Sequence, residues 1–322
     1  MNLKTERLLI RKFELMDWRS VHEYTSNQDA MRYMPEGVFT EELAQQFVSN
    51  NMDGKAEKFP VVLADEGTLI GHIVFHKYFG EHTYEIGWVF NPKFHNKGYA
   101  SEAALAVLKH AFEKMNLHRI IATCQPENTP SYRVMEKIGM RREGHFKKCI
   151  PHGDEWWDEY YYSILREDWE VQNLQHEVDA FKQWASGVTE KHSDWETEYL
   201  HWNSIYLAVR GVIGNTLIDD WNTAVYELIL YILARDNEVE NVLQMLVEHP
   251  GALVAIANKA LAYSDSQARW QVAHALGEIE GMDEEGINLL SRFSEDNVEY
   301  VRRRALVALD RRRGLNNIIN GE

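Results

Sequence analysis

The residues best placed for chemistry lie in one short stretch, Asn91-Pro92-Lys93-Phe94-His95-Asn96-Lys97-Gly98-Tyr99-Ala100-Ser101. An alternating segment, residues 83–90, precedes it, and residues 101–115 carry apolar side chains at helical spacing. A glycine-containing turn that opens a helix directs several backbone N–H groups at one point, at the positive end of the helix dipole. With the positive charge of Lys97 beside it, such a turn is suited to binding a phosphate or pyrophosphate.

The surroundings of the turn narrow this prediction. Residues 119–124 have the pattern of another strand, so the unit is strand, turn, helix, strand. No G-x-G-x-x-G motif occurs, which argues against a dinucleotide fold, and no G-K-[ST] follows, which argues against a P-loop. A plain connection between strand and helix is the alternative interpretation of the turn taken alone.

Residues 95–100 resemble the acetyl-CoA-binding motif Q/R-x-x-G-x-G/A of the GNAT (Gcn5-related) N-acetyltransferases, with His95 in the first position. Three further segments resemble the RimJ/RimL-type branch in the same order. Residues 3–11 resemble its opening strand, residues 128–144 its second CoA-contacting segment, and residues 153–169 its closing hairpin and last strand. The resemblance implies an α+β fold, with a mixed, mostly antiparallel sheet and flanking helices, and acetyl-CoA as cosubstrate.

The cofactor defines the first group of candidate residues. Backbone N–H groups of the turn suit its pyrophosphate. The resemblance implies that the strand before the turn separates from the next one and offers backbone groups to pantetheine and to the thioester oxygen. The cofactor-binding candidates are Trp88, Val89, Phe90, His95, Asn96, Lys97, Gly98, Tyr99, Ala100, Ser101, Asn128 and Ser131. Core packing is the alternative for the side chains of Trp88 and Phe90.

Two residues are candidates for catalysis. Glu85 lies on the strand that leads into the turn, on the face opposite the aromatic residues, and is the candidate base or water-positioning residue. A surface carboxylate is the alternative. Many members of the family carry a tyrosine at the position of Met135, as the acid that protonates the departing thiolate. A serine at the position of Ser131 is the usual substitute in the RimJ/RimL-type branch, so the resemblance implies that role for Ser131. The alternative is a plain serine at a helix N-terminus.

After Trp169 the strand pattern ends and the chain is helical by pattern. Residues 268–276 align with residues 301–309, an offset of 33 positions. That offset is typical of paired-helix solenoids, and the V-R…A-L pattern resembles HEAT-like repeats. We therefore expect two domains, an acetyltransferase domain over residues 1–170 and an all-α HEAT-like domain over residues 171–322.

Composition limits the partners and the compartment. A net charge of −16 disfavours nucleic acid and favours cationic partners. No apolar run reaches the ~18–20 residues of a membrane span, and the N-terminus lacks a signal-peptide core. Two cysteines, Cys124 and Cys149, provide neither a disulfide framework nor a metal quartet. We expect a cytoplasmic protein that uses no metal and does not act on membranes.

The function expected from these observations is acetyl transfer from acetyl-CoA to a primary amine by direct attack in a ternary complex, because no nucleophile motif is present. The acceptor, expected to be cationic, is a protein N-terminus, a small-molecule amine or an aminoacyl conjugate. The alternative is a CoA-binding interaction protein whose helical domain recruits a protein partner.

Overall fold

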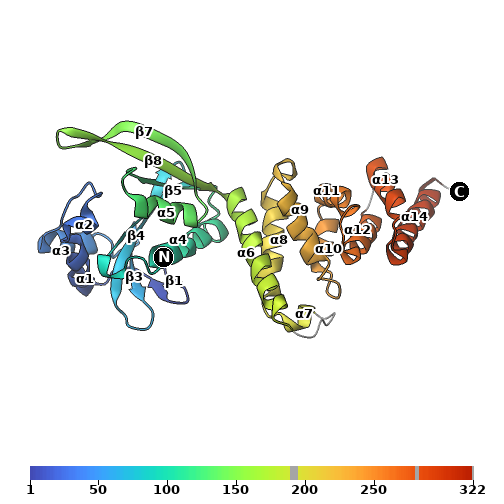
Figure 1. The fold of residues 1–322 in the computed structure, drawn as a ribbon, viewed down its shortest axis with the longest axis horizontal. Coiled ribbons are helices and arrows are strands. Elements are labelled where there is room, and N and C mark those ends of the chain that lie inside the picture. The colour runs from blue at the N-terminus through green and yellow to red at the C-terminus, as the bar shows by residue number, and fades with distance from the viewer. Residues whose placement is uncertain (189–194, 280–282, 321–322) are drawn as a thin grey trace. The chain divides into compact units, whose positions relative to one another are not determined.

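The computed structural model describes residues 1–188, 195–279 and 283–320, with side chains as far as residue 311. The chain divides into two compact units, Met1–Trp169 and a second unit that begins at Glu170. This division lies within helix α6 (Arg166–Ser186), one residue from the expected boundary. The strands belong to the N-terminal unit, and the described part of the second unit is helical (Figure 1).

The N-terminal unit is built on an eight-stranded sheet. Its strands are β1 (Leu3–Lys4), β2 (Leu8–Ile10), β3 (Lys58–Leu63), β4 (Leu69–Phe79), β5 (Thr83–Phe90), β6 (Arg119–Cys124), β7 (Arg141–His152) and β8 (Glu155–Leu165). Its helices are α1 (Trp18–Thr25), α2 (Gln28–Met31), α3 (Glu41–Ser49), α4 (Tyr99–Glu113) and α5 (Thr129–Lys137), with 3-10 turns η1 (Leu15–Asp17) and η2 (Pro92–Phe94).

The strand order is β1-β2-β3-β4-β5-β6-β8-β7, and neighbouring strands are antiparallel except β5 and β6, which are parallel. A parallel pair requires a crossover connection, and here the turn and helix α4 provide it. The strand, turn, helix, strand unit predicted from the sequence is therefore this β5–α4–β6 crossover. The mixed, mostly antiparallel sheet confirms the predicted fold class.

Helices cover both faces of the sheet around β5. Because side chains alternate along a strand, Ile86 and Phe90 enter one core and Val89 enters the other. The first core contains Leu108 of α4 and Ile138, which follows α5. The second contains side chains of α1 and α3. Strand β5 is thus fixed from both sides at the point where the turn begins.

The second unit consists of helices over its described length. After α6 these are α7 (Trp195–Glu198), α8 (Trp202–Asn215), the 3-10 turn η3 (Ile218–Asp220), α9 (Thr223–Leu233), α10 (Asn241–Val247), α11 (Pro250–Ala260), α12 (Ser266–Glu278), α13 (Glu284–Phe293) and α14 (Glu299–Asn320). Helices α8, α10, α12 and α14 contact one another in succession, and α9, α11 and α13 do the same. This is the stacking of helix pairs that solenoids use.

The two similar sequence segments lie on α12 and α14, which pack directly against each other. A Cβ atom on Gly277 of α12 would come 2.6 Å from the Cβ atom of Ala308 on α14, so the glycine permits the close approach. The assignment to HEAT-like repeats stays a prediction. None of the helices in the described part of the chain is both long and apolar enough to span a membrane.

Candidate active site

The turn between β5 and α4 has two residues in the left-handed backbone region. Asn96 has φ 60° and Gly98 has φ 81°. Gly98 is the N-cap residue of α4 and carries no side chain that could cap it. The first backbone N–H groups of α4 have no partner within a helix, so they are available to an anion at this end.

A network from the first hairpin holds the turn in place. Glu102, in the first turn of α4, accepts hydrogen bonds from Thr5 Oγ1 at 2.5 Å, Arg7 N at 3.1 Å and Arg7 Nε at 2.7 Å. Arg7 Nη1 also donates to the carbonyl oxygen of Lys97 at 3.1 Å, and the guanidinium lies 4.6 Å from the centre of the Tyr99 ring. Burial acts to raise the pKa of Glu102, but the hydrogen bonds from Thr5 and Arg7 outweigh it and lower the pKa. The charge of Glu102 is therefore paired with Arg7 beside the anion-binding turn.

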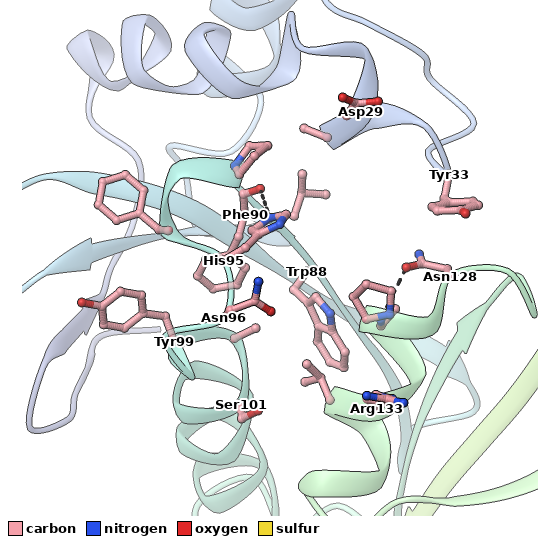
Figure 2. Close-up of a pocket in the computed structure, with 18 of the residues that line it drawn as sticks. Asp29, Tyr33, Trp88, Phe90, His95, Asn96, Tyr99, Ser101, Asn128 and Arg133 are labelled. Atoms are coloured by element: carbon pink, nitrogen blue, oxygen red, sulfur yellow. Dashed lines mark hydrogen bonds between the residues drawn. The ribbon is translucent and has the colours of Figure 1, made fainter.

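Strand β5 pairs with β6 over only its first residues, from Thr83–Arg119 to Glu85–Ile121. Its pairing with β4 continues to Phe90. The backbone N–H of Asn91 donates to the carbonyl oxygen of Ile70 in β4 at 2.9 Å. Because the backbone groups of successive strand residues point to opposite edges of the strand, those of Phe90 and Trp88 point toward the β6 side. His95 Nε2 donates a hydrogen bond to the carbonyl oxygen of Phe90 at 2.9 Å (Figure 2). The backbone of Trp88 is thus offered to a ligand beyond the end of the β5–β6 pairing.

Gly71 of β4 lies opposite this part of β5. A Cβ atom at Gly71 would come 2.5 Å from the carbonyl oxygen of Val89 and 2.8 Å from the Cα atom of Phe90. Both are backbone atoms, which cannot rotate away as a side chain can. The absence of a side chain at Gly71 therefore allows β5, the strand with the unpaired backbone groups, to lie this close to β4.

We expect Gly71→Ala to displace β5, lowering the free energy of unfolding by about 1–3 kcal/mol, as overpacking does, and weakening acetyl-CoA binding. Gly54→Ala is the matched control because no atom lies within 4 Å of a Cβ there. Chemical denaturation and titration calorimetry give the two quantities. Unchanged stability and affinity in Gly71→Ala would show that β5 tolerates a side chain at this point.

A cavity of about 690 Å³ lies between the turn, β5, α5 and the segment around α2. Figure 2 shows Trp88 near its centre, between Tyr99 and Ser101 of α4 and Arg133 of α5. Of the cofactor-binding candidates predicted from the sequence, it brings together Trp88, Val89, Phe90, His95, Asn96, Gly98, Tyr99, Ala100, Ser101, Asn128 and Ser131. Lys97 does not line it; its Nζ atom lies 5.4 Å from the centre of the Phe94 ring.

Sequence reasoning missed two walls of this cavity. One is the segment at α2, with Asp29, Ala30, Arg32, Tyr33 and Met34, and the other is the face of α5, with Pro130, Arg133, Val134 and Lys137. The helical spacing of the α5 residues was a usable signal. The α2 wall had no such sequence signal, because it is placed by a contact between distant segments. Tyr33 Oη donates a hydrogen bond to the carbonyl oxygen of Glu127 at 3.2 Å.

Ser131 lies in the first turn of α5 and lines the cavity. Its backbone N–H donates a hydrogen bond to Asn128 Oδ1 at 3.4 Å. Met135, one turn later, is only 1% exposed and packs in the core. Burial raises the pKa of the neighbouring Cys124 thiol to about 12, although a hydrogen bond with Ser131 acts to lower it. Ser131 is therefore the hydroxyl that α5 presents to the cavity, and Cys124 is a neutral thiol.

Glu85 does not line the cavity. It lies on the other face of β5, where Thr123 Oγ1 donates to its carboxylate at 3.3 Å and His76 Nε2 lies 3.6 Å away. Burial raises the pKa of Glu85, while His76 and the Thr123 hydrogen bond act to lower it. If Glu85 takes a proton from an amine that attacks a thioester in the cavity, it must therefore act from the opposite face of β5, near the end of the β5–β6 pairing.

Comparisons with known proteins identify the class of protein. Residues 7–141 match the family model described as an acetyltransferase (GNAT) domain. An uncharacterized N-acetyltransferase, YnaD, of Bacillus subtilis (strain 168) is 72% identical over 169 residues, which cover 52% of this chain and 99% of that protein. The [ribosomal protein uS5]-alanine N-acetyltransferase of Escherichia coli (strain K12) is 25% identical over 181 residues, 52% of this chain and 92% of that protein.

A crystal structure of a GNAT-family acetyltransferase from Bacillus anthracis is 75% identical, covers 51% of this chain and 98% of its own chain, and superposes with a TM-score of 0.50. The chain belongs to the GNAT family through its N-terminal half, which is an acetyl-CoA-dependent N-acetyltransferase domain. Among the described residues, no group of three or more His, Cys, Asp or Glu side chains could hold a metal ion.

Proposed function

We propose that this protein transfers the acetyl group of acetyl-CoA to a primary amine by direct attack of the amine on the thioester. One observation carries the proposal. The uncapped N-terminus of α4, the backbone of β5 beyond its pairing with β6, and Ser131 all line the same cavity. An anion site, a polar backbone and a hydroxyl are the groups that this cofactor requires.

The donor would lie along this series of groups. The pyrophosphate suits the N–H groups at Gly98–Ser101, and the pantetheine arm suits the space between β5 and the start of α5. The backbone N–H of Trp88 faces that space, whereas the carbonyl oxygen of Phe90 is already bonded to His95. Trp88 is therefore our candidate donor to the thioester oxygen as its negative charge develops.

The departing thiolate needs a proton, and Ser131 is our candidate to supply it. We expect Ser131→Ala to lower turnover by ~10²-fold, the lower range of general acid catalysis, with little change in affinity for acetyl-CoA. Steady-state rates and equilibrium binding give the two quantities. A Ser131→Ala enzyme with normal turnover would remove this role, and Tyr132 would be the next residue to test.

The acceptor amine must be neutral to attack. At pH 7 deprotonation costs ~1.4 kcal/mol for an α-amine with a pKa of ~8, and ~4.6 kcal/mol for a lysine-type amine with a pKa of ~10.4. Glu85, on the sheet face away from α4 and α5, is our candidate to take this proton through water. By strand alternation Glu159 shares that face with Tyr161, so a second carboxylate lies on the acceptor side. Both favour a cationic acceptor.

Direct attack is favoured over an acetyl-enzyme because the cysteine beside Ser131, Cys124, has a thiol whose pKa burial raises to about 12. A thiol that stays protonated is a poor nucleophile. Acetyl-CoA alone should therefore release no burst of free CoA thiol.

A screen of amines with free CoA thiol as the readout tests the proposal. The panel contains peptides with free N-termini, polyamines and aminoacyl conjugates. A peptide from ribosomal protein uS5 is included, because one relative is named for alanine acetylation of that protein. We expect thiol release only when an amine is present. Binding of acetyl-CoA without transfer to any amine would favour a CoA-binding interaction protein that recruits a partner through its helical unit.

A further inference from the structure

The cavity continues past the turn along helix α5. Helix α4 contributes only its N-terminal end, from Gly98 to Ser101, whereas α5 contributes residues from Pro130 to Lys137, over more than one helical turn. Figure 2 shows Arg133 across from Ser101, at the end of the cavity away from Asp29 and Tyr33. A ligand whose pyrophosphate lies at Gly98–Ser101 would therefore have its next chemical group beside this part of α5.

Two basic side chains lie there, and neither has a partner among the described residues. Arg133 and Lys137 are one helical turn apart, and both line the cavity and are exposed. Neither forms a hydrogen bond or an ion pair with the residues that the structure describes, whereas Arg7 at the other side of the turn is fully engaged by Glu102. Lys137 gains from its position near the C-terminal end of the helix dipole, but Arg133, in the middle of α5, does not.

The charge of the cavity changes along its length. At the α2 end an acidic residue, Asp29, and a basic one, Arg32, both line the cavity. At the α5 end Arg133 and Lys137 line it, and α5 contributes no acidic lining residue. In a chain with a net charge of −16, an unpaired basic pair in a cavity indicates an anionic ligand group. Guanidinium and ammonium groups are the usual ligands of a phosphomonoester, which carries close to two negative charges at neutral pH.

We propose that Arg133 and Lys137 bind the 3′-phosphate of the CoA ribose and so make the enzyme select CoA over donors that lack this phosphate. The inference rests on the proposed placement of acetyl-CoA in the cavity. It assigns a function to two residues outside the turn. It also predicts that the pyrophosphate and the 3′-phosphate are recognised by different means, backbone N–H groups for the first and side-chain charges for the second.

Equilibrium binding of CoA and of 3′-dephospho-CoA to the full chain tests this inference without any acceptor. We expect the wild-type protein to bind CoA at least about tenfold more tightly, the lower range for hydrogen bonds between charged groups at an exposed site. The double variant Arg133→Gln, Lys137→Gln should bind the two ligands equally, because its affinity for CoA falls while that for dephospho-CoA stays the same. The preference of the wild-type protein should also fall as salt is added.

The matched control is Lys109→Gln with Lys114→Gln. It removes the same charge from exposed positions of the N-terminal unit that do not line the cavity, and it should keep the wild-type preference. Equal affinity of the wild-type protein for both ligands, or an unchanged preference in the Arg133, Lys137 variant, would overturn the inference. Either result would leave the proposed acetyl transfer intact, whereas failure of both ligands to bind would contradict both.

Discussion

We expect Gly98→Val to abolish acetyl-CoA binding while the protein stays folded. Gly98 has φ 81° and ψ 0°, a left-handed conformation that a β-branched residue adopts only at a cost of roughly 1–2 kcal/mol. The space around it is open inside the chain, since the nearest atom to a new Cβ would be Arg7 Nη2 at 3.6 Å. Relief of the strain would therefore move the turn itself and redirect the first N–H groups of α4. Loss of two or more charge-assisted hydrogen bonds corresponds to about 100-fold or more in affinity.

Gly67→Val is the matched control for this experiment. Gly67 has φ 68° in the turn between β3 and β4, with no atom within 4 Å of a Cβ, so the variant carries the same backbone strain away from the cavity. Both variants should lose a similar amount of thermal stability, and only Gly98→Val should lose the ligand. Retained affinity in a folded Gly98→Val protein would show that the turn is a plain connection.

The second large effect is expected from Glu85→Gln. If Glu85 accepts the acceptor's proton through water, turnover near pH 7 should fall by about tenfold for an α-amine, whose deprotonation costs ~1.4 kcal/mol, and by more for a lysine-type amine. Above the pKa of the amine no base is needed, so the defect should shrink as pH rises. Rates from pH 7 to pH 9.5 measure this. A loss that stays constant over that range would reject the base role and leave a positioning one.

The raised pKa of Glu85 also predicts a change in stability. Burial disfavours its ionised form in the folded state, so the folded protein holds this proton to a higher pH than the unfolded chain does. Between the unfolded value near ~4.3 and the higher folded pKa, wild-type stability should fall as pH rises. Glu85→Gln removes that dependence, so its stability relative to wild type should increase over the same interval.

Glu81→Gln is the control for both measurements, because Glu81 is exposed at the end of the same hairpin and pairs with Lys77. It should not change the rate profile. The hydrogen bond from Lys77 lowers the pKa of Glu81, so the effect of this variant on the pH dependence of stability should lie mainly below the unfolded value, outside that interval.

The turn and its flanking elements were predictable because their signals are local. Alternation over residues 83–90, a glycine before a helical pattern, and a second strand at residues 119–124 identify β5, α4 and β6, which the structure confirms. The left-handed conformation at Gly98 explains why glycine stands there.

The parts that escaped prediction depend on contacts between distant segments. Arg7 and Glu102 are 95 positions apart in the sequence, and Tyr33 and Glu127 are 94 apart, so both contacts depend on the tertiary fold. Helix α2 spans only Gln28–Met31, too short for an amphipathic pattern to reveal that it borders a cavity. Strand periodicity correctly predicted that Glu85 lies on the face of β5 opposite the aromatic residues. It could not show that this face lies outside the cavity.

Thermal unfolding of the full chain with and without acetyl-CoA tests the central claim most directly, because it needs no acceptor. Ligand at 100 times its Kd should raise the free energy of unfolding by about 2.7 kcal/mol. NAD and ATP at the same concentration should give much smaller shifts, since the chain lacks the glycine-rich motifs that bind them. An unchanged transition in millimolar acetyl-CoA would contradict the assignment of this cavity to the cofactor.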